Sequence, residues 1–141
     1  NLYSRERPIY TNPRFLPGTK VNRCQVEQAI FCEGSILSDS TVRRSIVGIR
    51  AIVREGAQVT DSVIMGARFY EAKTPPGGVG LGIGRNCEIR RAIVDLDARI
   101  GDGVKIVNAE NVQDQRGENW SICNGIVVVP RGAVIPPGTV I

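Results

Sequence analysis

The stretch Val42-Arg43-Arg44-Ser45-Ile46-Val47 consists of one aliphatic residue, two polar residues, one small residue and two apolar residues. The same order occurs in three other places, at 26–31, 59–64 and 89–94. The first three copies begin 16 and 17 residues apart, and the fourth begins 30 residues after the third. A period of roughly 16–18 residues, divided into steps of about six, is typical of a repeat whose copies stack on one another.

Each six-residue step is expected to form a short strand and a turn, so that three steps close one triangular coil. The leading aliphatic residue then fills the interior of the coil. Because strand side chains alternate, the residue two positions earlier also points inward. That earlier position holds a small residue in every copy, namely Cys24, Ser40, Ala57 and Cys87.

The pattern therefore predicts an all-β fold, a left-handed parallel β-helix of hexapeptide-type repeats with roughly five to six coils and two loop excursions. Val26, Val42, Val59 and Ile89 are expected to stack inside it. The composition agrees, because hydrophobic residues make up 42% of the chain but aromatic residues only 5%. Such a chain favours a core of stacked aliphatic side chains.

The 141 residues divide into two predicted parts. Residues 1–20 do not follow the repeat and are expected to form a junction or linker, and 21–141 are expected to form the β-helix domain. Loop excursions are predicted near 67–80, which is rich in Pro and Gly, and near 108–124, which is polar and non-periodic. The chain ends on a repeat position, so we expect exposed strand edges there that another subunit could cover.

Charge and hydropathy exclude several function classes. The net charge is +4, but no run of Lys and Arg is interleaved with aromatic residues, so nucleic acid is not an expected partner. No stretch approaches the ~20 apolar residues of a membrane span, and no signal peptide is present, so a cytoplasmic location is predicted. Small anions are the expected partners of a mildly basic chain.

The side-chain inventory argues against catalysis by this chain, and no catalytic or metal-binding residue is predicted. It contains no His, whereas acyltransferases of this fold need a His base and the carbonic anhydrases need His ligands for zinc. Gly80-Leu81-Gly82-Ile83-Gly84 lacks the Lys-Ser/Thr of a phosphate loop and is better explained as a turn into the next coil. Cys24 and Cys87 are interpreted as small core residues, while Cys32 and Cys123 have no assigned role.

Several stretches resemble the ADP-glucose pyrophosphorylases (glucose-1-phosphate adenylyltransferases), most closely the plant and cyanobacterial branch. The resemblance covers the chain from about residue 2 to residue 141. The motifs that carry it are 8–17, 45–50, Met65-Gly66-Ala67 with Tyr70-Glu71, 82–84, 98–102, 124–129 and 135–141.

The resemblance implies a parent enzyme that makes ADP-glucose and pyrophosphate from ATP and glucose 1-phosphate, with Mg²⁺, for glycogen or starch synthesis. Its catalytic site lies in an N-terminal domain that this sequence lacks, so the fragment needs no cofactor and is expected to be inactive alone. The resemblance further implies a regulatory and oligomerisation domain that packs on the catalytic domain and joins subunits into homo-tetramers. It also implies a plastid location if the source is a plant.

The resemblance also implies a site for a phosphorylated small-molecule effector. Arg14 matches the junction arginine of the family, Asn12 matches a junction glutamine, and Arg131 matches a lysine near the end of the chain. Leu96 matches a family lysine and cannot bind an anion. Two alternatives remain open: a stand-alone β-helix scaffold or binding protein, and a different sugar nucleotidyltransferase.

Overall fold

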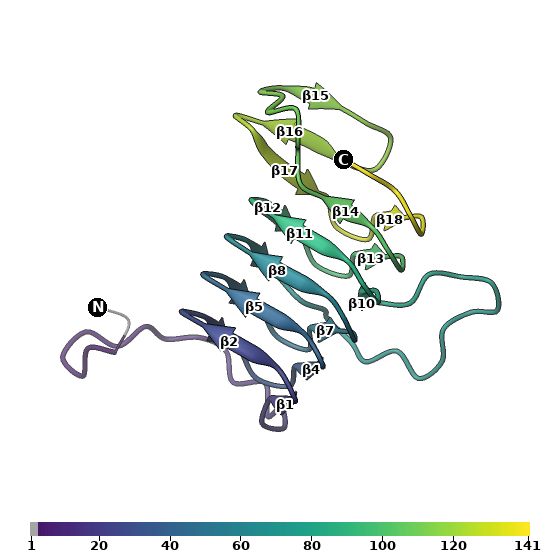
Figure 1. The fold of residues 1–141 in the computed structure, drawn as a ribbon. Helices are drawn as coiled ribbons and strands as arrows, with labels where there is room; N and C mark the ends of the chain where they lie inside the picture. The colour runs from purple at the N-terminus through teal and green to yellow at the C-terminus, as the bar shows by residue number, and fades with distance from the viewer. Residues whose placement is uncertain (1–2) are drawn as a thin grey trace.

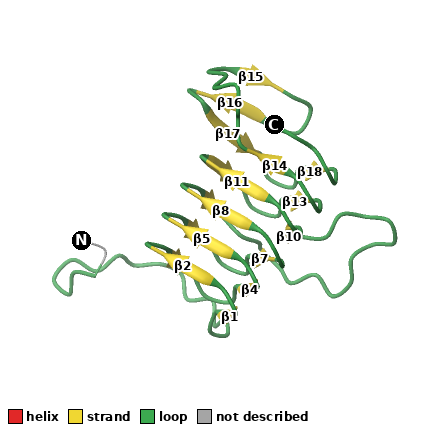
Figure 2. Ribbon diagram, viewed as in Figure 1, coloured by secondary structure: helices red, strands yellow, loops and turns green. Residues whose placement is uncertain are grey.

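In the computed structural model, which describes residues 3–141, the chain forms short β-strands and, within those residues, no helix. The strands stack in successive coils, so that each face of the stack is one sheet (Figures 1 and 2). The predicted all-β parallel β-helix is therefore confirmed.

Three sheets run along the stack. The first sheet contains β1 (Lys20–Asn22), β4 (Ile36–Ser38), β7 (Ile52–Val53), β10 (Gly82–Ile83), β13 (Arg99–Ile100) and β18 (Val134–Ile135). The second sheet contains β2 (Gln25–Glu27), β5 (Thr41–Arg43), β8 (Gln58–Thr60), β11 (Glu88–Arg90) and β14 (Lys105–Ile106). The third sheet contains β3 (Ile30–Phe31), β6 (Ile46–Val47), β9 (Val63–Ile64), β12 (Ala92–Val94), β17 (Ile126–Val129), β16 (Ser121–Cys123) and β15 (Gln115–Arg116).

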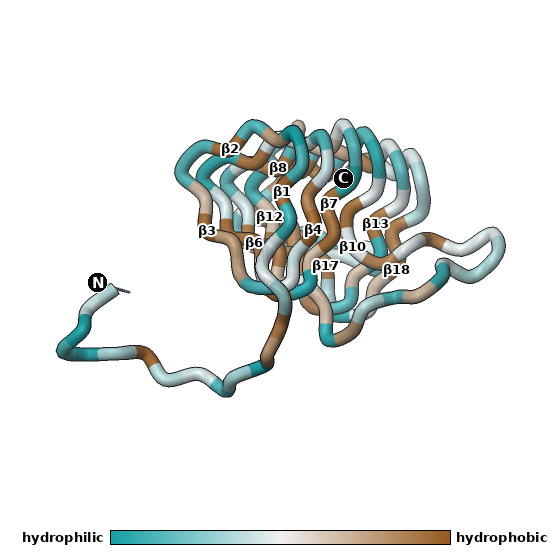
Figure 3. Tube along the Cα trace, turned by 90° about the horizontal axis from the view of Figure 1, so that it is seen from below, coloured by the Kyte–Doolittle hydropathy of each residue, from teal (hydrophilic) through white to brown (hydrophobic). Residues whose placement is uncertain are grey.

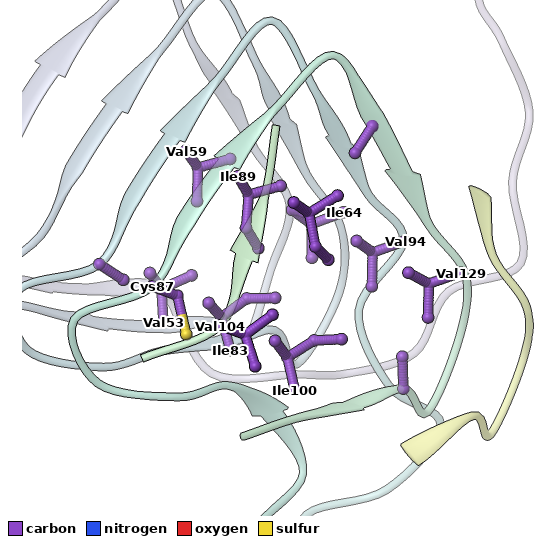
Figure 4. Packing of buried hydrophobic residues seen from close by; sticks show 14 of the residues in the cluster. Val53, Val59, Ile64, Ile83, Cys87, Ile89, Val94, Ile100, Val104 and Val129 are labelled. Atoms are coloured by element: carbon purple, nitrogen blue, oxygen red, sulfur yellow. The ribbon is translucent and has the colours of Figure 1, made fainter. Parts of the chain in front are cut away.

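The predicted register of the repeat is confirmed in the second sheet. Val26 pairs with Val42, Val42 with Val59, and Val59 with Ile89, all in parallel. Val42, Val59 and Ile89 are at most 1% exposed, and Figure 4 shows Val59 and Ile89 pointing into the shared core. The expectation for Val26 was wrong, because its side chain is 45% exposed. It belongs to the first coil, where no further coil of the described chain covers the core.

The corners of the triangle explain the small residues of the repeat. At a corner one residue takes a positive φ, as Arg44 does (φ 44), and a small residue follows it. The Ser45 hydroxyl donates to the Arg43 carbonyl at 2.6 Å and accepts from the Ser62 N–H of the next coil at 3.1 Å. Cys87 occupies an equivalent place and is 1% exposed, and burial raises the pKa of its thiol. The interpretation of Cys87 as a core residue is therefore confirmed, whereas Cys24 is only partly buried.

Two segments leave the coils. Residues 65–81 contain no strand, and the part between the buried Ala67 and Leu81 projects from the stack, as does the N-terminal segment (Figure 3). The second segment, expected as a polar excursion near 108–124, is not only a loop. It contains β15 and β16, which pair in antiparallel fashion with each other and with β17.

The hairpin corrects the expectation of exposed strand edges for the third sheet alone, since β18 remains the last strand of the first sheet. Ile122 is 4% exposed, and Val112 and Trp120 pack against the core. The chain's own hairpin therefore continues the third sheet beyond β17. The C-terminal residue is also bound, since the Ile141 N–H donates to the Lys105 carbonyl at 2.8 Å.

Candidate anion-binding site

Four arginines gather at the corner where the third sheet turns into the first, and we call this group the arginine corner: Arg14, Arg50, Arg68 and Arg131. Arg50 occupies the corner between β6 and β7, with a φ of 50. Arg131 lies between β17 and β18, and Arg68 lies near the start of the 65–81 excursion. Arg14 comes from the N-terminal segment.

An open cavity of about 550 Å³ lies at the arginine corner. Arg14, Arg50 and Arg68 line it together with Leu96, and Ile49 and Met65 are among its apolar walls. The sequence analysis placed Arg14 and Leu96 at one site, and the structure brings both to this cavity.

The other two predicted residues lie outside the cavity lining. Arg131 does not line the cavity but is connected to it, because its Nε lies 3.8 Å from Oδ2 of Asp97, the neighbour of Leu96 in the chain. Asn12 is exposed and does not line the cavity. The structure therefore groups Arg14 with Leu96, places Arg131 beside them, and leaves Asn12 outside.

Arg14 reaches the cavity because the N-terminal segment is attached to the first coil. The Gly34 N–H donates to the Pro17 carbonyl at 2.8 Å, and the Thr19 hydroxyl donates to the Cys32 carbonyl at 2.5 Å. Gly34 has a φ of +73, and a Cβ there would collide with the Tyr70 hydroxyl. Only glycine fits this position, where the segment and the excursion meet.

The excursion is tied to the corner through Arg68 and Asp97. The Arg68 backbone N–H donates to Oδ1 of Asp97 at 2.8 Å, and its Nε donates to Oδ2 at 2.5 Å. The Asp97 side chain is 7% exposed. Burial alone would raise the pKa of Asp97, but the two hydrogen bonds from Arg68 and the charges of Arg68 and Arg131 outweigh it and hold that pKa below its ordinary value.

Tyr70 and Glu71 complete this attachment. The Tyr70 hydroxyl donates to the Gly34 carbonyl at 2.8 Å, and the Arg50 guanidinium lies 5.7 Å from the centre of the Tyr70 ring. Glu71 accepts the Leu81 N–H at 3.1 Å and pairs with Nη1 of Arg99 at 2.6 Å. The corner is therefore held by contacts from three separate coils.

Sequence reasoning missed Arg50, Arg68 and Asp97. Arg50 and Asp97 share one signal, a polar residue directly before a small residue at the corner, Ala51 and Ala98. Arg68 follows Ala67 and has no periodic signal, because it lies outside the repeat.

The glycine-rich stretch at 80–84 is part of the coil. Gly82 and Ile83 form β10 and pair with the neighbouring coils, which confirms that the glycine-rich stretch returns the chain to the stack. The Leu81 N–H of that stretch already donates to Glu71. Residues 3–141 bring together no group of three or more Cys, Asp or Glu side chains that could hold a metal ion, and they form no helix able to cross a membrane.

Comparisons with known proteins agree with this architecture. A family model described as the GLGC left-handed parallel beta-helix domain matches residues 14–140. The glucose-1-phosphate adenylyltransferase small subunit, chloroplastic/amyloplastic, of Triticum aestivum is 42% identical over 149 aligned residues, which cover 100% of this chain and 32% of the wheat protein. The chain thus spans about a third of the length of that relative. It belongs to the family of GLGC left-handed parallel β-helix domains, which confirms the resemblance that its motifs predicted.

Proposed function

We propose that this chain is the C-terminal regulatory and assembly domain of an ADP-glucose pyrophosphorylase. The longer protein would form ADP-glucose and pyrophosphate from ATP and glucose 1-phosphate with Mg²⁺, and its catalytic site would lie outside these residues. The observation that carries the regulatory part is the convergence of Arg14, Arg50 and Arg68 on one cavity. The match of the family model over 14–140 supports the enzyme class.

In this proposal residues 1–20 are the junction to the catalytic domain and 21–141 are the β-helix domain. Arg14 lies in the junction but lines a cavity of the β-helix. An anion held there would contact both parts at once. Binding could then change the position of the junction relative to the β-helix. Such a change is the physical requirement for regulating a distant catalytic site.

The proposed ligand is a phosphorylated small molecule such as 3-phosphoglycerate, or phosphate itself. Guanidinium groups bind phosphate through paired N–H donors, and several converging donors are needed, since one exposed charge contributes little. Arg14 and Arg131 are the proposed contacts, with Asn12 as a third donor if the N-terminal segment moves inward. Leu96 adds no charge to the cavity wall.

The outer face of the third sheet is the proposed assembly surface. A ladder of aliphatic side chains runs across it in register: Ile30, Ile46, Val63, Ile93 and Val128. Ile30, Ile46 and Ile93 are 38%, 41% and 36% exposed. The outer face of the second sheet is polar by contrast, with Gln25, Thr41, Gln58, Glu88 and Lys105 in register. An apolar sheet face of this kind favours contact with another domain or subunit, in keeping with a homo-tetramer in the cytoplasm or a plastid.

The test is an assay of the complete coding sequence that contains this chain. With ATP, glucose 1-phosphate and Mg²⁺ we expect ADP-glucose, and we expect 3-phosphoglycerate or phosphate to change the rate. Arg14→Ala should weaken that response and leave the rate without effector unchanged. Formation of a different sugar nucleotide would replace the proposal with another nucleotidyltransferase. No sugar nucleotide at all would favour the scaffold alternative.

A further inference from the structure

The cavity at the arginine corner has a cation that the sequence analysis did not assign. Arg68 lines it beside Leu96, and its side chain is 58% exposed. A guanidinium carries five N–H donors, and Nε of Arg68 is bound to Asp97. The Nη groups of Arg68 therefore remain the donors with which it can contact an anion in the cavity.

Asp97 fixes Arg68 in this place. Both the backbone N–H and Nε of Arg68 are bound to the same carboxylate, so the start of the excursion and the guanidinium are held together. The carboxylate is nearly buried, at 7% exposed, and it also faces Nε of Arg131 at 3.8 Å. Asp97 is therefore a negative charge shared by two cations of the corner.

We propose that Arg68 is a direct anion-binding residue of this cavity and that Asp97 is its internal counter-ion, which both positions Arg68 and competes with a bound phosphate. The inference rests on the proposed effector site and adds to it the residues that set its strength. Arg68 supplies the charge on the side of the cavity where Leu96 supplies none. Asp97 lowers the affinity, because an incoming phosphate must share Arg68 and Arg131 with it.

The competition sets the class of ligand. A carboxylate ligand carries one negative charge and two acceptor oxygens, the same as the Asp97 side chain that already binds the arginines. A phosphate monoester carries close to two charges at neutral pH and three acceptor oxygens. It can bind Arg14, Arg50 and Arg68 at once while Asp97 stays in place, so the site should select phosphate esters over simple carboxylates.

The test uses calorimetric titration of the 141-residue chain with inorganic phosphate at constant ionic strength. Arg68→Gln should weaken binding about threefold to tenfold, the value expected of a partly exposed charged contact. Leu96→Lys should restore binding in the Arg68→Gln variant, since both residues line one cavity. The matched control is Arg90→Gln, because Arg90 is 55% exposed, is paired with Glu88 at 2.9 Å and lies on the second sheet. Its affinity should equal that of the wild type.

Asp97→Asn gives an independent outcome. It should tighten phosphate binding about threefold, because the competing charge is gone. The fold of Asp97→Asn is checked by circular dichroism. If this variant unfolds, the affinity of Arg68→Gln alone tests whether Arg68 contacts the anion. If Arg14→Gln weakens binding but Arg68→Gln and Arg90→Gln leave it unchanged, this inference is wrong and the effector site stands. If wild-type chain binds no phosphate, both are wrong.

Discussion

Glu71 and Arg99 form the least exposed ion pair in residues 3–141, with 2.6 Å between Oε1 and Nη1 and side chains 10% and 23% exposed. The pair joins the 65–81 excursion to β13, and Arg99 also donates to the Val79 carbonyl at 2.9 Å. The excursion is therefore bound at both of its ends.

Loss of this pair should destabilise the chain. Glu71→Gln removes the charge opposite Arg99, and we expect the free energy of unfolding to fall by about 1–2 kcal/mol. Urea denaturation measures the change. Glu27→Gln is the matched control, because Glu27 faces Arg43 at 3.6 Å with its side chain 61% exposed, and its effect should be close to zero. Equal effects at both positions would contradict the anchoring role of Glu71.

The core of the repeat gives a second prediction. Val59 is 0% exposed and lies between Val42 and Ile89, whereas Val26 pairs with Val42 in the same register but is 45% exposed. Val59→Ala should lower the free energy of unfolding by about 2 kcal/mol through lost burial and a cavity, and Val26→Ala by less than about 1 kcal/mol. Similar losses in urea denaturation would show that the first coil is covered in solution.

Acid should destabilise the corner. The pKa of Glu71 is lowered, because the hydrogen bond from the Leu81 N–H and the interaction with Arg99 outweigh the effect of burial. Burial would raise the pKa of Asp97, but Arg68 and Arg131 outweigh it and lower that pKa. A carboxylate with a lowered pKa in the folded state stabilises above its ordinary pKa, and that stability is lost as the pH falls through the folded value.

The melting temperature should therefore be steady between about pH 7 and pH 5 and should fall below about pH 4. Asp97→Asn should show a smaller fall, since one of the titrating groups is removed. A variant with an unchanged acid profile would mean that the Asp97 carboxylate adds no pH-dependent stability.

The isolated chain should not make ADP-glucose. The glycine-rich stretch 80–84 lacks the Lys-Ser/Thr of a phosphate loop, and its Leu81 N–H is used within the fold. With ATP, glucose 1-phosphate and Mg²⁺ at saturation, we expect no product above the level of a mock preparation. Turnover that survives repeated purification and tracks with this chain would contradict the assignment of catalysis to another domain.

The coils could be predicted from the sequence because each copy of the repeat has the same order of residue types. An aliphatic residue must point inward, and the small residue two positions before it must fit a corner, as with Ser40 before Val42. The exposure of Val26 did not follow, because burial depends on a neighbouring coil and not on the residue itself.

The β15–β16 hairpin and the Arg68–Asp97 pair could not be predicted for a different reason. Ile122 has few apolar neighbours in sequence, and its strand is set by antiparallel pairing with β17. Arg68 and Asp97 are 29 residues apart and meet because the excursion returns along one corner. Both contacts depend on the path that a loop takes through space. The order of residue types within one segment does not determine that path.

Anion binding at the arginine corner can be tested by following the arginine side chains themselves. Nuclear magnetic resonance of the ¹⁵N-labelled chain can record each Nε–H signal during a titration with inorganic phosphate. We predict saturable shifts at Arg14, Arg50, Arg68 and Arg131. Signals of Arg23 and Arg44, which pair with Asp39 and Asp61 at other corners, should stay in place. Shifts confined to arginines outside the corner, or no shift at any arginine, would show that the arginine corner does not bind anions.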